Sequence, residues 1–437
     1  MQASVASHHP TSIGQRELIV LIALLMSLNA LCIDGMLPAL DDIARELGAA
    51  SGNQRQLVVG VYLLANGLGC LLPGSFADRF GRKPVIMVAL AAYAFFSLVV
   101  ATVDNFALLL VARGLQGLFC AGLMVAPTAI VRDQFEGDKM ARTMSNVSAV
   151  FITVPVIAPS LGQTVLLVAG WRWIFVCLAC LAGIAAAWTW TRLPETLAPD
   201  NRQHIHLRTI AGNMRIAFFN RASIGYVLGS MLVMGGVFGY VNSAQQLIGE
   251  HFGAGRWFPV VFGGTAAMMA VSNLVNSRIV ERFGARRVSH AGVIVFILVS
   301  MGQVWAATFR DGQLVWFLPL MATNLALLGF LGANFSSIAM QPFARIAGAA
   351  SSVQTFFRMF GAALVGIVIG QAYDGTARPF AFALLIGSTA ALALVLFSEK
   401  GRLFRRLNAP GGQGVEQVAR SGARHRPPAS ADLSPEA

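Results

Sequence analysis

The sequence predicts an all-α membrane protein in which twelve transmembrane helices form two six-helix bundles, with both termini in the cytoplasm. Three observations predict this architecture. Only 12% of the 437 residues are charged and 56% are hydrophobic, whereas a soluble domain carries roughly 25% charged residues. Cutting the chain at its charged residues leaves twelve apolar stretches, and one polar motif recurs at the same place in each half.

Each apolar stretch is long enough to cross a hydrocarbon core of about 30 Å as a helix. Gly and Pro are frequent in these stretches, and membrane helices tolerate both residues better than soluble helices do. In chain order, the predicted spans are residues 18–40, 56–77, 84–103, 105–131, 143–169, 173–191, 222–248, 258–280, 288–309, 312–334, 347–373 and 379–398.

The longest polar segment between spans separates six predicted helices from the next six. The predicted organisation is a cytoplasmic N-terminal tail (1–17), an N-terminal bundle (18–191), a cytoplasmic central loop (192–221), a C-terminal bundle (222–398) and a cytoplasmic tail (399–437) that we expect to be disordered. The tail is rich in Gly, Pro, Ser and Arg, a composition that buries too little apolar surface to fold.

The distribution of basic residues predicts the orientation. With the N-terminus in the cytoplasm, 24 of the 32 Lys and Arg residues fall in cytoplasmic segments and 6 in outer loops, while Arg113 and Arg358 lie inside spans. This bias follows the positive-inside rule. The basic residues are spread among short loops rather than clustered with base-reading side chains, which excludes a nucleic-acid partner. The partner expected instead is the lipid bilayer.

The recurring motif lies between the second and third helix of each half. Its first copy runs Gly74-Ser-Phe-Ala-Asp78-Arg79-Phe80-Gly81-Arg82-Lys83, and acid–Arg–Phe–Gly returns 203 residues later at Glu281. Gly74 would allow close helix approach, and Gly81 would permit a tight turn. Asp78 could cap a helix start or pair with an Arg. We expect a breakable latch that closes one face; the alternative is a turn that only sets topology.

These residues resemble the cytoplasmic signature of the major facilitator superfamily. Further resemblances follow in order along the chain. Leu109, Arg113, Gln116 and Gly117 resemble the family's fourth-helix motif. Pro155, Pro159 and Gly162 resemble the bent-helix motif of its drug antiporters, with Ala158 where a Gly is usual. The chain also resembles the bicyclomycin-resistance branch of twelve-helix drug/proton antiporters. That resemblance lies at Asp34 with Pro38, Gly332–Asn334 and Ala347–Ser351.

The resemblance covers residues 18–398. It implies two bundles that rock about a midplane cavity in a bacterial inner (cytoplasmic) membrane, with protons and small amphipathic drug-like compounds, cationic or neutral, as the species transported. The sequence departs from the branch at Ala333, Gln245 and Arg358. These departures bear on the substrate rather than on the fold.

Asp34 is the one acidic residue of 20 that lies well inside a predicted span. A carboxylate there costs roughly 2.5–3.5 kcal/mol on insertion scales, and such residues mark proton or substrate paths. Arg113 is predicted at a matching depth. A structural salt bridge between them is one interpretation. The other is a coupling site, in which Asp34 exchanges a proton for a cationic drug while Arg113 tunes its charge.

A broad pocket is predicted beside Asp34. Helical spacing puts Met26 and Ala30 on nearly the same face as Asp34, with Asn29 and Ile33 beside it. Polar side chains that could orient a ligand, or could equally form interhelical hydrogen bonds, are Tyr62, Asn146, Tyr240 and Asn242. Arg358 could face the cavity and attract an anionic substrate, or it could snorkel toward the cytoplasm.

The predicted function is therefore drug/proton antiport by a monomer. Pro155 and Pro159 each remove a backbone hydrogen bond, and the resulting bend would help to seal the cavity or would be a static kink. The sequence has no Walker A pattern and no metal-ligand set, so we expect no enzyme activity, metal or cofactor, and the proton gradient as energy source. The alternative is proton-coupled transport of a metabolite such as a sugar, amino acid or organic anion.

Overall fold

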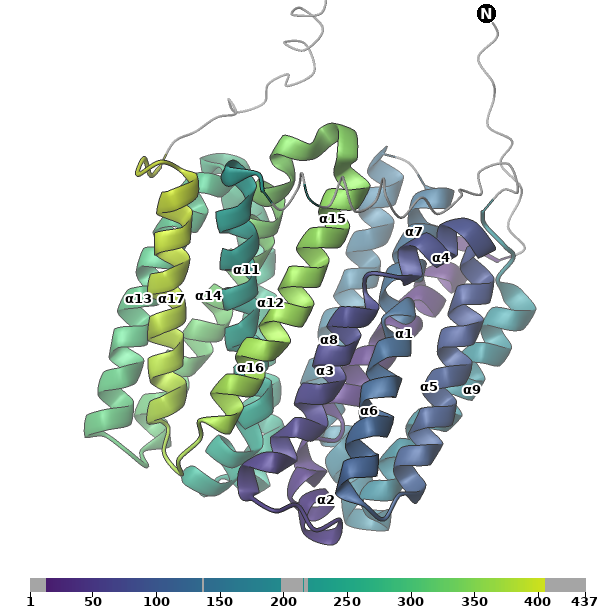
Figure 1. Ribbon diagram of the computed structural model, residues 1–437, viewed down its shortest axis with the longest axis horizontal. Coiled ribbons are helices and arrows are strands. Elements are labelled where there is room, and N and C mark those ends of the chain that lie inside the picture. The colour runs from purple at the N-terminus through teal and green to yellow at the C-terminus, as the bar shows by residue number, and fades with distance from the viewer. Residues whose placement is uncertain (1–12, 136, 198–214, 216–218, 405–437) are drawn as a thin grey trace, which may run out of the picture.

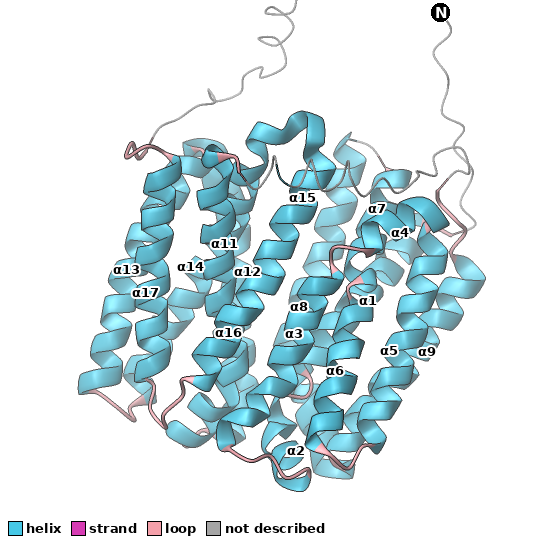
Figure 2. Cartoon of the chain, viewed as in Figure 1, coloured by secondary structure: helices cyan, strands magenta, loops and turns pink. Residues whose placement is uncertain are grey.

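A computed structural model of the protein describes residues 13–135, 137–197, 215 and 219–404. Helices dominate these residues, and none of them forms a strand (Figure 2). The described chain begins and ends at the same face of the molecule, which we call the terminal face, and the other end is the opposite face (Figure 1). The predicted N-terminal tail, central loop and C-terminal tail lie mostly outside the described residues, so their boundaries stay predictions.

The first half of the fold comprises the elements up to α9. In order, these are α1 (Gln15–Asp34), η1 (Leu37–Ala39), α2 (Leu40–Glu46), η2 (Gly52–Gln56), α3 (Leu57–Gly69), α4 (Pro73–Phe80), α5 (Arg82–Thr102), α6 (Phe106–Cys120), α7 (Gly122–Gln134), α8 (Gly137–Ala169) and α9 (Trp171–Arg192).

The second half comprises the elements from α11 onward. In order, these are α11 (Arg221–Ala244), η4 (Gln245–His251), η5 (Gly255–Trp257), α12 (Phe258–Phe283), α13 (Ala285–Phe309), α14 (Leu314–Met340), η6 (Gln341–Ile346), α15 (Ala347–Phe356), η7 (Phe357–Gly361), α16 (Ala362–Gln371) and α17 (Arg378–Ser398). The two halves lie side by side (Figure 1).

The predicted spans are confirmed as helices. In the described chain, eleven helical segments are long and apolar enough to cross a membrane, and a twelfth span results if the pair 52–69 and 73–80, bent by 46°, is counted as one. Several spans are broken rather than straight. The first breaks after Asp34 and continues to Glu46, and both η4 and η7 are π-helical. Short π segments of this kind occur often at functional sites.

The internal repeat extends from the sequence to the side chains. Gly81 (φ 105°) and Gly284 (φ 83°) both make the turn into the next helix with a positive φ, a conformation that favours Gly. In the first half Gln116 Nε2 donates to Ser97 Oγ over 2.7 Å. In the second half Ser300, 203 residues after Ser97, donates to Asn324 Oδ1 over 3.3 Å. In each half, a serine at the equivalent position thus joins the third helix to an amide side chain of the fourth, although Ser97 accepts the hydrogen bond and Ser300 donates it.

The halves contact each other along two lines, which together we call the seam. Along one line α3 packs on η7 and α16, and along the other α8 packs on α12. Missing side chains allow the approach: a Cβ at Gly67 would collide with the backbone of Phe360, and one at Gly263 would lie 2.7 Å from the Val156 carbonyl oxygen. Close approach through Gly is the usual way in which membrane helices pack.

Candidate functional site

Asp34 is the last residue of α1, at the point where the first span breaks. The helix stops because Gly35 and the nearby Pro38 cannot extend it well, and the span continues through η1 and α2. The Asp34 side chain is buried, with 6% of its surface exposed. No hydrogen bond or ion pair joins it to any other residue that the structure describes. A buried carboxyl group without a partner is costly, which makes this position a candidate functional site.

Arg113, fully buried in α6, holds α1 just before that break. Its Nη1 donates to Cys32 Sγ over 2.9 Å and its Nη2 to the Cys32 carbonyl over 3.3 Å. Its Nη1 also donates to Gln116 Oε1 over 2.7 Å, its Nε reaches the Val58 carbonyl, and the guanidinium lies 4.3 Å from the Tyr62 ring centroid. Carbonyl, thiol and ring contacts thus replace an acidic partner for this cation.

Asp34 and Arg113 form no ion pair in this conformation, so the structural salt bridge considered above is not present here. The reason is the direction of the side chains. Cys32 and Asp34 are two residues apart on a helix, and residues at that spacing point to different sides. Since Cys32 faces Arg113, Asp34 faces away from it. The sequence predicted that Asp34 and Arg113 lie at the same depth in the membrane, but it did not predict that their side chains point in different directions.

The side of α1 that carries Asp34 packs against α8. Ala30, one turn before Asp34, forms a small apolar cluster with Val154 and Ala158 of α8. A Cβ at Gly162 would collide with the carbonyl oxygen of Gly35, so the absence of a side chain there lets α8 reach the break. α8 remains one helix through Pro155 and Pro159.

The remaining predicted pocket residues differ in their partners and in their burial. Asn29 accepts a hydrogen bond from the Tyr62 hydroxyl over 2.8 Å, beside Arg113. Tyr240 is internal to the second half, bonded to Thr265 over 3.0 Å. The other positions differ in exposure: Met26 and Ile33 are half-buried, and Asn146 on α8 is exposed. Asn242 is buried beside Gly60 and Gly370 at the seam, and neither polar atom of its amide has a hydrogen-bond partner among the described residues.

The halves are tied together by polar contacts at the opposite face, which we call the polar latch. Asn53 donates to the carbonyls of Tyr373 and Gln371 over 2.7 and 3.2 Å and accepts from Gln246 over 3.1 Å. Gln56 also bonds to Gln246, and Arg55 pairs with Glu250. Among described residues, every hydrogen bond and ion pair between the halves lies here. Sequence reasoning missed the latch, although its Asn and Gln residues lie at or next to the ends of predicted spans two, seven and eleven.

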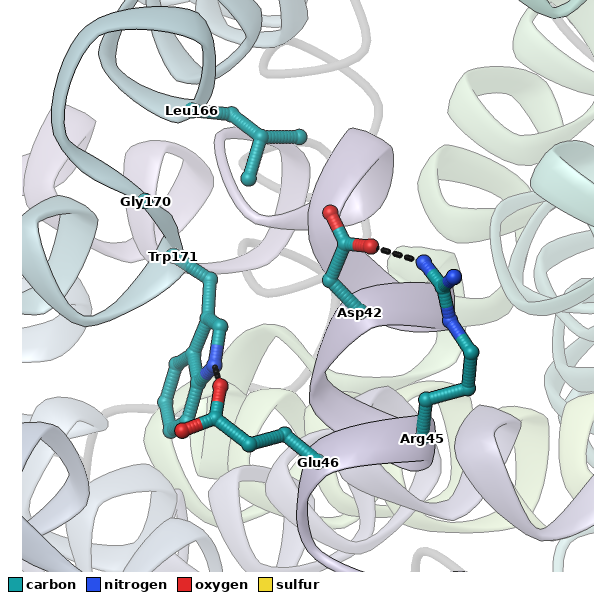
Figure 3. A pocket seen from close by; sticks show the side chains of 6 residues that line it. All are labelled: Asp42, Arg45, Glu46, Leu166, Gly170 and Trp171. Atoms are coloured by element: carbon teal, nitrogen blue, oxygen red, sulfur yellow. Dashed lines mark hydrogen bonds and ion pairs between the residues drawn. The ribbon is translucent and has the colours of Figure 1, made fainter.

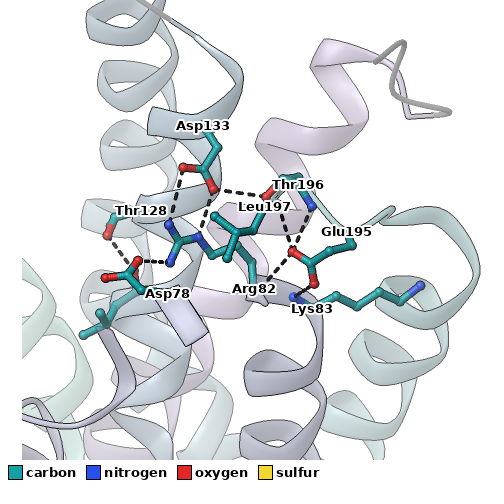
Figure 4. Close-up of polar contacts among 9 residues, drawn as sticks. Asp78, Arg82, Lys83, Thr128, Asp133, Glu195, Thr196 and Leu197 are labelled. Atoms are coloured by element: carbon teal, nitrogen blue, oxygen red, sulfur yellow. Dashed lines mark hydrogen bonds and ion pairs between the residues drawn. The ribbon is translucent and has the colours of Figure 1, made fainter. Parts of the chain in front are cut away.

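The recurring motif forms a charged cluster at the terminal face (Figure 4). Arg82 donates to Asp78 over 2.5 Å and to Asp133 of α7 over 2.9 Å. Glu195, after α9, accepts from the backbone amides of Arg82 and Lys83 over 2.9 and 3.1 Å and so caps α5. The cap is therefore Glu195, while Asp78 forms the ion pair.

The expected role of Gly74 in close helix packing is not seen in the structure. A Cβ there would meet Val125 at an ordinary 3.7 Å, so no close helix approach depends on it. Arg79, the remaining charged residue of the motif, contacts the ring of Phe80, with 5.2 Å between its guanidinium carbon and the ring centroid.

A shallow hollow at the opposite face is lined by Asp42, Arg45, Glu46, Leu166, Gly170 and Trp171 (Figure 3). Its acidic groups already have partners. Asp42 pairs with Arg45, and Glu46 accepts from the Trp171 ring nitrogen over 2.5 Å. The hollow therefore offers no free charge to a ligand.

A family model described as the Major Facilitator Superfamily matches residues 22–366. The chain belongs to the major facilitator superfamily. Its relatives within this superfamily include a bicyclomycin resistance protein homolog of Haemophilus influenzae, 26% identical over 370 residues (84% of this chain, 92% of the relative). The multidrug resistance protein MdtL of Shewanella oneidensis is 28% identical over 374 residues (83% and 91%).

Solved structures of the superfamily share the fold at low identity. The D-xylose-proton symporter superposes with a TM-score of 0.68 at 15% identity, covering 89% of this chain and 97% of the symporter. A bacterial homolog of the human lysosomal transporter Spinster, in an inward-facing and unoccupied conformation, gives a TM-score of 0.65 at 16% identity (89% and 96%). This multi-pass membrane protein thus has the fold of superfamily transporters.

Proposed function

We propose that the protein is a proton-coupled multidrug efflux transporter that exchanges protons for drug-like compounds by alternating access. The observation that carries the proposal is Asp34: a buried, unpartnered carboxyl group at the break of a membrane helix. The names of the bicyclomycin and multidrug resistance relatives support drug-like compounds, cationic or neutral, as the substrates.

Asp34 would carry either a proton or the positive charge of a substrate, but not both. A protonated carboxyl group is neutral and tolerates its buried site. A deprotonated one needs a counter-charge, and Arg113 is committed to Cys32, Gln116 and Val58. A cationic substrate would supply the missing counter-charge, so that proton release and drug binding become one exchange.

The charge on Asp34 can act on the seam through α8. Gly35, next to Asp34, lies directly against Gly162 of α8. Another face of the same helix contacts the second half, where the Val156 carbonyl approaches Gly263. A change in charge that moves the break in α1 would therefore be transmitted through a rigid, closely packed helix to the partner half.

The conformation described here would be the state open to the terminal face. Polar contacts hold the halves together at the opposite face, while the charged cluster of Asp78, Arg82 and Asp133 lies within the first half. Transport would require the polar latch to separate and the terminal face to close. With the positive-inside bias of the sequence, we assign the terminal face to the cytoplasm of a bacterial cell and the membrane to its inner membrane.

The test is proton release caused by substrate binding. Wild type and Asp34→Asn are purified in detergent with minimal buffer, and the lipophilic cation tetraphenylphosphonium is added while pH is recorded. Asp42→Asn is the matched control, because Asp42 is a half-buried acid of the same span that pairs with Arg45. We expect proton release from wild type and from Asp42→Asn, and none from Asp34→Asn.

Two results would overturn the proposal. Equal release from Asp34→Asn would place the exchanged proton elsewhere. Binding of the cation to wild type without any proton release would exclude exchange at a shared site. Reconstitution in vesicles then checks the coupling directly: an imposed proton gradient should drive uptake or release of the cation by wild type and Asp42→Asn but not by Asp34→Asn.

A further inference from the structure

Arg358 is a second unpartnered charge within the spans, and it lies in the other half of the molecule. No hydrogen bond, ion pair or ring contact joins it to any other residue that the structure describes. Arg113, the other Arg within a span, has six such contacts to its neighbours. A guanidinium group placed in a membrane normally faces a water-filled space and has a carbonyl or acidic partner. Arg358 has no such partner in the part of the chain that the structure describes.

The position of Arg358 on the seam is fixed by the π segment η7. This segment packs against α3 of the first half, where Gly67 admits the backbone of Phe360. The guanidinium lies within electrostatic reach of Cys70, at the bend of the second span. The extra residue in a π turn re-aims the side chains that follow it, which accounts for a charged side chain beside the partner half.

Three aromatic residues lie within two positions of Arg358 in the sequence. The rings of Phe356 and Phe360 stack with centroids 5.0 Å apart, and Phe357 lies edge-on to Phe356 at 5.3 Å. Arg358 and all three Phe residues are half-buried, so each keeps some accessible surface. A guanidinium group binds carboxylates and similar anions through paired hydrogen bonds, and the neighbouring rings offer an apolar surface to an aromatic body.

We propose that Arg358 binds the anionic group of an aromatic substrate at the seam, so that the compounds transported include aromatic organic anions and amphoteric compounds. This inference rests on the proposed function and extends its substrate class beyond cations and neutral compounds. Asp34 lies on α1 of the first half and Arg358 on the second half. In an amphoteric substrate, Asp34 would bind the cationic end and Arg358 the anionic end.

The test compares two ligands that differ in charge but share their rings: 1-naphthylacetate and its methyl ester. Binding to the detergent-purified full chain is measured for wild type, Arg358→Gln and Arg358→Lys, with Arg256→Gln as a control at an exposed outer loop position. We expect Arg358→Gln to weaken acid binding by about 10- to 100-fold, as expected for lost hydrogen bonds to a charged group. Ester binding should be unchanged, and Lys should restore part of the acid affinity.

A second measurement needs no bound ligand. In a background with Cys177 and Cys180 replaced by Ala, Cys70 is the remaining cysteine with accessible surface. Its reaction with an anionic methanethiosulfonate (ethylsulfonate) and a cationic one (ethyltrimethylammonium) is timed. A nearby guanidinium should favour the anionic reagent, and Arg358→Gln should lower the anionic-to-cationic rate ratio by about fivefold, as Coulomb's law at short range implies.

Three results would overturn the inference. Equal loss of acid and ester binding in Arg358→Gln would mean a structural role. Unchanged acid binding together with an unchanged reagent ratio would mean that Arg358 does not face the seam. A wild type that binds the ester but not the acid would exclude the anionic class. None of these results depends on tetraphenylphosphonium-driven proton release. The inference about Arg358 and the proposed function can therefore fail independently of each other.

Discussion

The substitution Asn53→Ala should open the opposite face. Asn53 lies in η2, where the second span begins, and its side chain makes three of the hydrogen bonds that cross the polar latch. Ala keeps the helical turn and removes all three. The remaining contacts, including the Arg55–Glu250 ion pair, stay in place. In the proposed alternating-access cycle, the equilibrium should therefore move toward the state that is open at this face.

The expected size of the shift follows from those bonds. A hydrogen bond contributes about 0.5–1.5 kcal/mol net, and the partial exposure of Asn53 favours the lower half of that range. Three bonds then give about 2 kcal/mol, which corresponds to a shift of about 30-fold in the ratio of closed to open opposite faces.

Distances between two spin labels would measure this shift. Cysteines replace Ser51 in the first half and Ala372 in the second, both exposed at the opposite face, after the accessible native cysteines are replaced by Ala. The control is Gln54→Ala, because Gln54 accepts only from the Ala50 amide of its own half. A population at longer distance should grow in Asn53→Ala and not in the control.

The reasoning would be refuted if Asn53→Ala left the distance distribution as in wild type. It would also be refuted if Gln54→Ala lengthened the distance equally, because the effect would then come from the loop and not from bonds between the halves.

Three further predictions concern positions that hold the first half together. Gly162→Val should lower the free energy of unfolding by about 1–3 kcal/mol, the usual cost of overpacking, because the new side chain would collide with the Gly35 carbonyl. The control Gly183→Val, whose side chain would lie in open space, should change stability little. Equal melting temperatures for the two variants would contradict this account. Arg113→Lys should lose at least one of the two bonds to Cys32 of α1 and reduce proton release at Asp34; normal release would argue against a positioning role. Glu195→Ala should uncap α5 and speed amide exchange at its first residues by a factor corresponding to about 1 kcal/mol; unaltered exchange there would count against the cap.

Part of the candidate site could be predicted from sequence because its constraint is local. A membrane imposes a long apolar run on every helix, so twelve runs predict twelve spans. A carboxylate within such a run is rare, so Asp34 stands out without any structure. The turn glycines Gly81 and Gly284 were likewise visible through the repeated motif.

Other features depended on side chains that are distant in sequence. The polar latch joins η2 to η4 and to the end of α16. Its Asn and Gln residues look like any other Asn and Gln in the sequence, so nothing marks them as partners. The partners of Arg113 include a thiol, carbonyls and a ring. Asp34, the one acid that the sequence predicted at the same depth, is not among them. Tyr240, predicted as a pocket residue, instead bonds within its own half to Thr265.

The sequence by itself determined which segments cross the membrane, the twofold repeat and the position of a buried acid, because the energy of hydrocarbon burial is a property of each segment alone. Only the tertiary structure decided which way each polar side chain points and which half it contacts. Those outcomes depend on where helices break and on where a missing side chain lets two backbones meet. The separation of Asp34 from Arg113 and the placement of Arg358 on the seam were decided in this way.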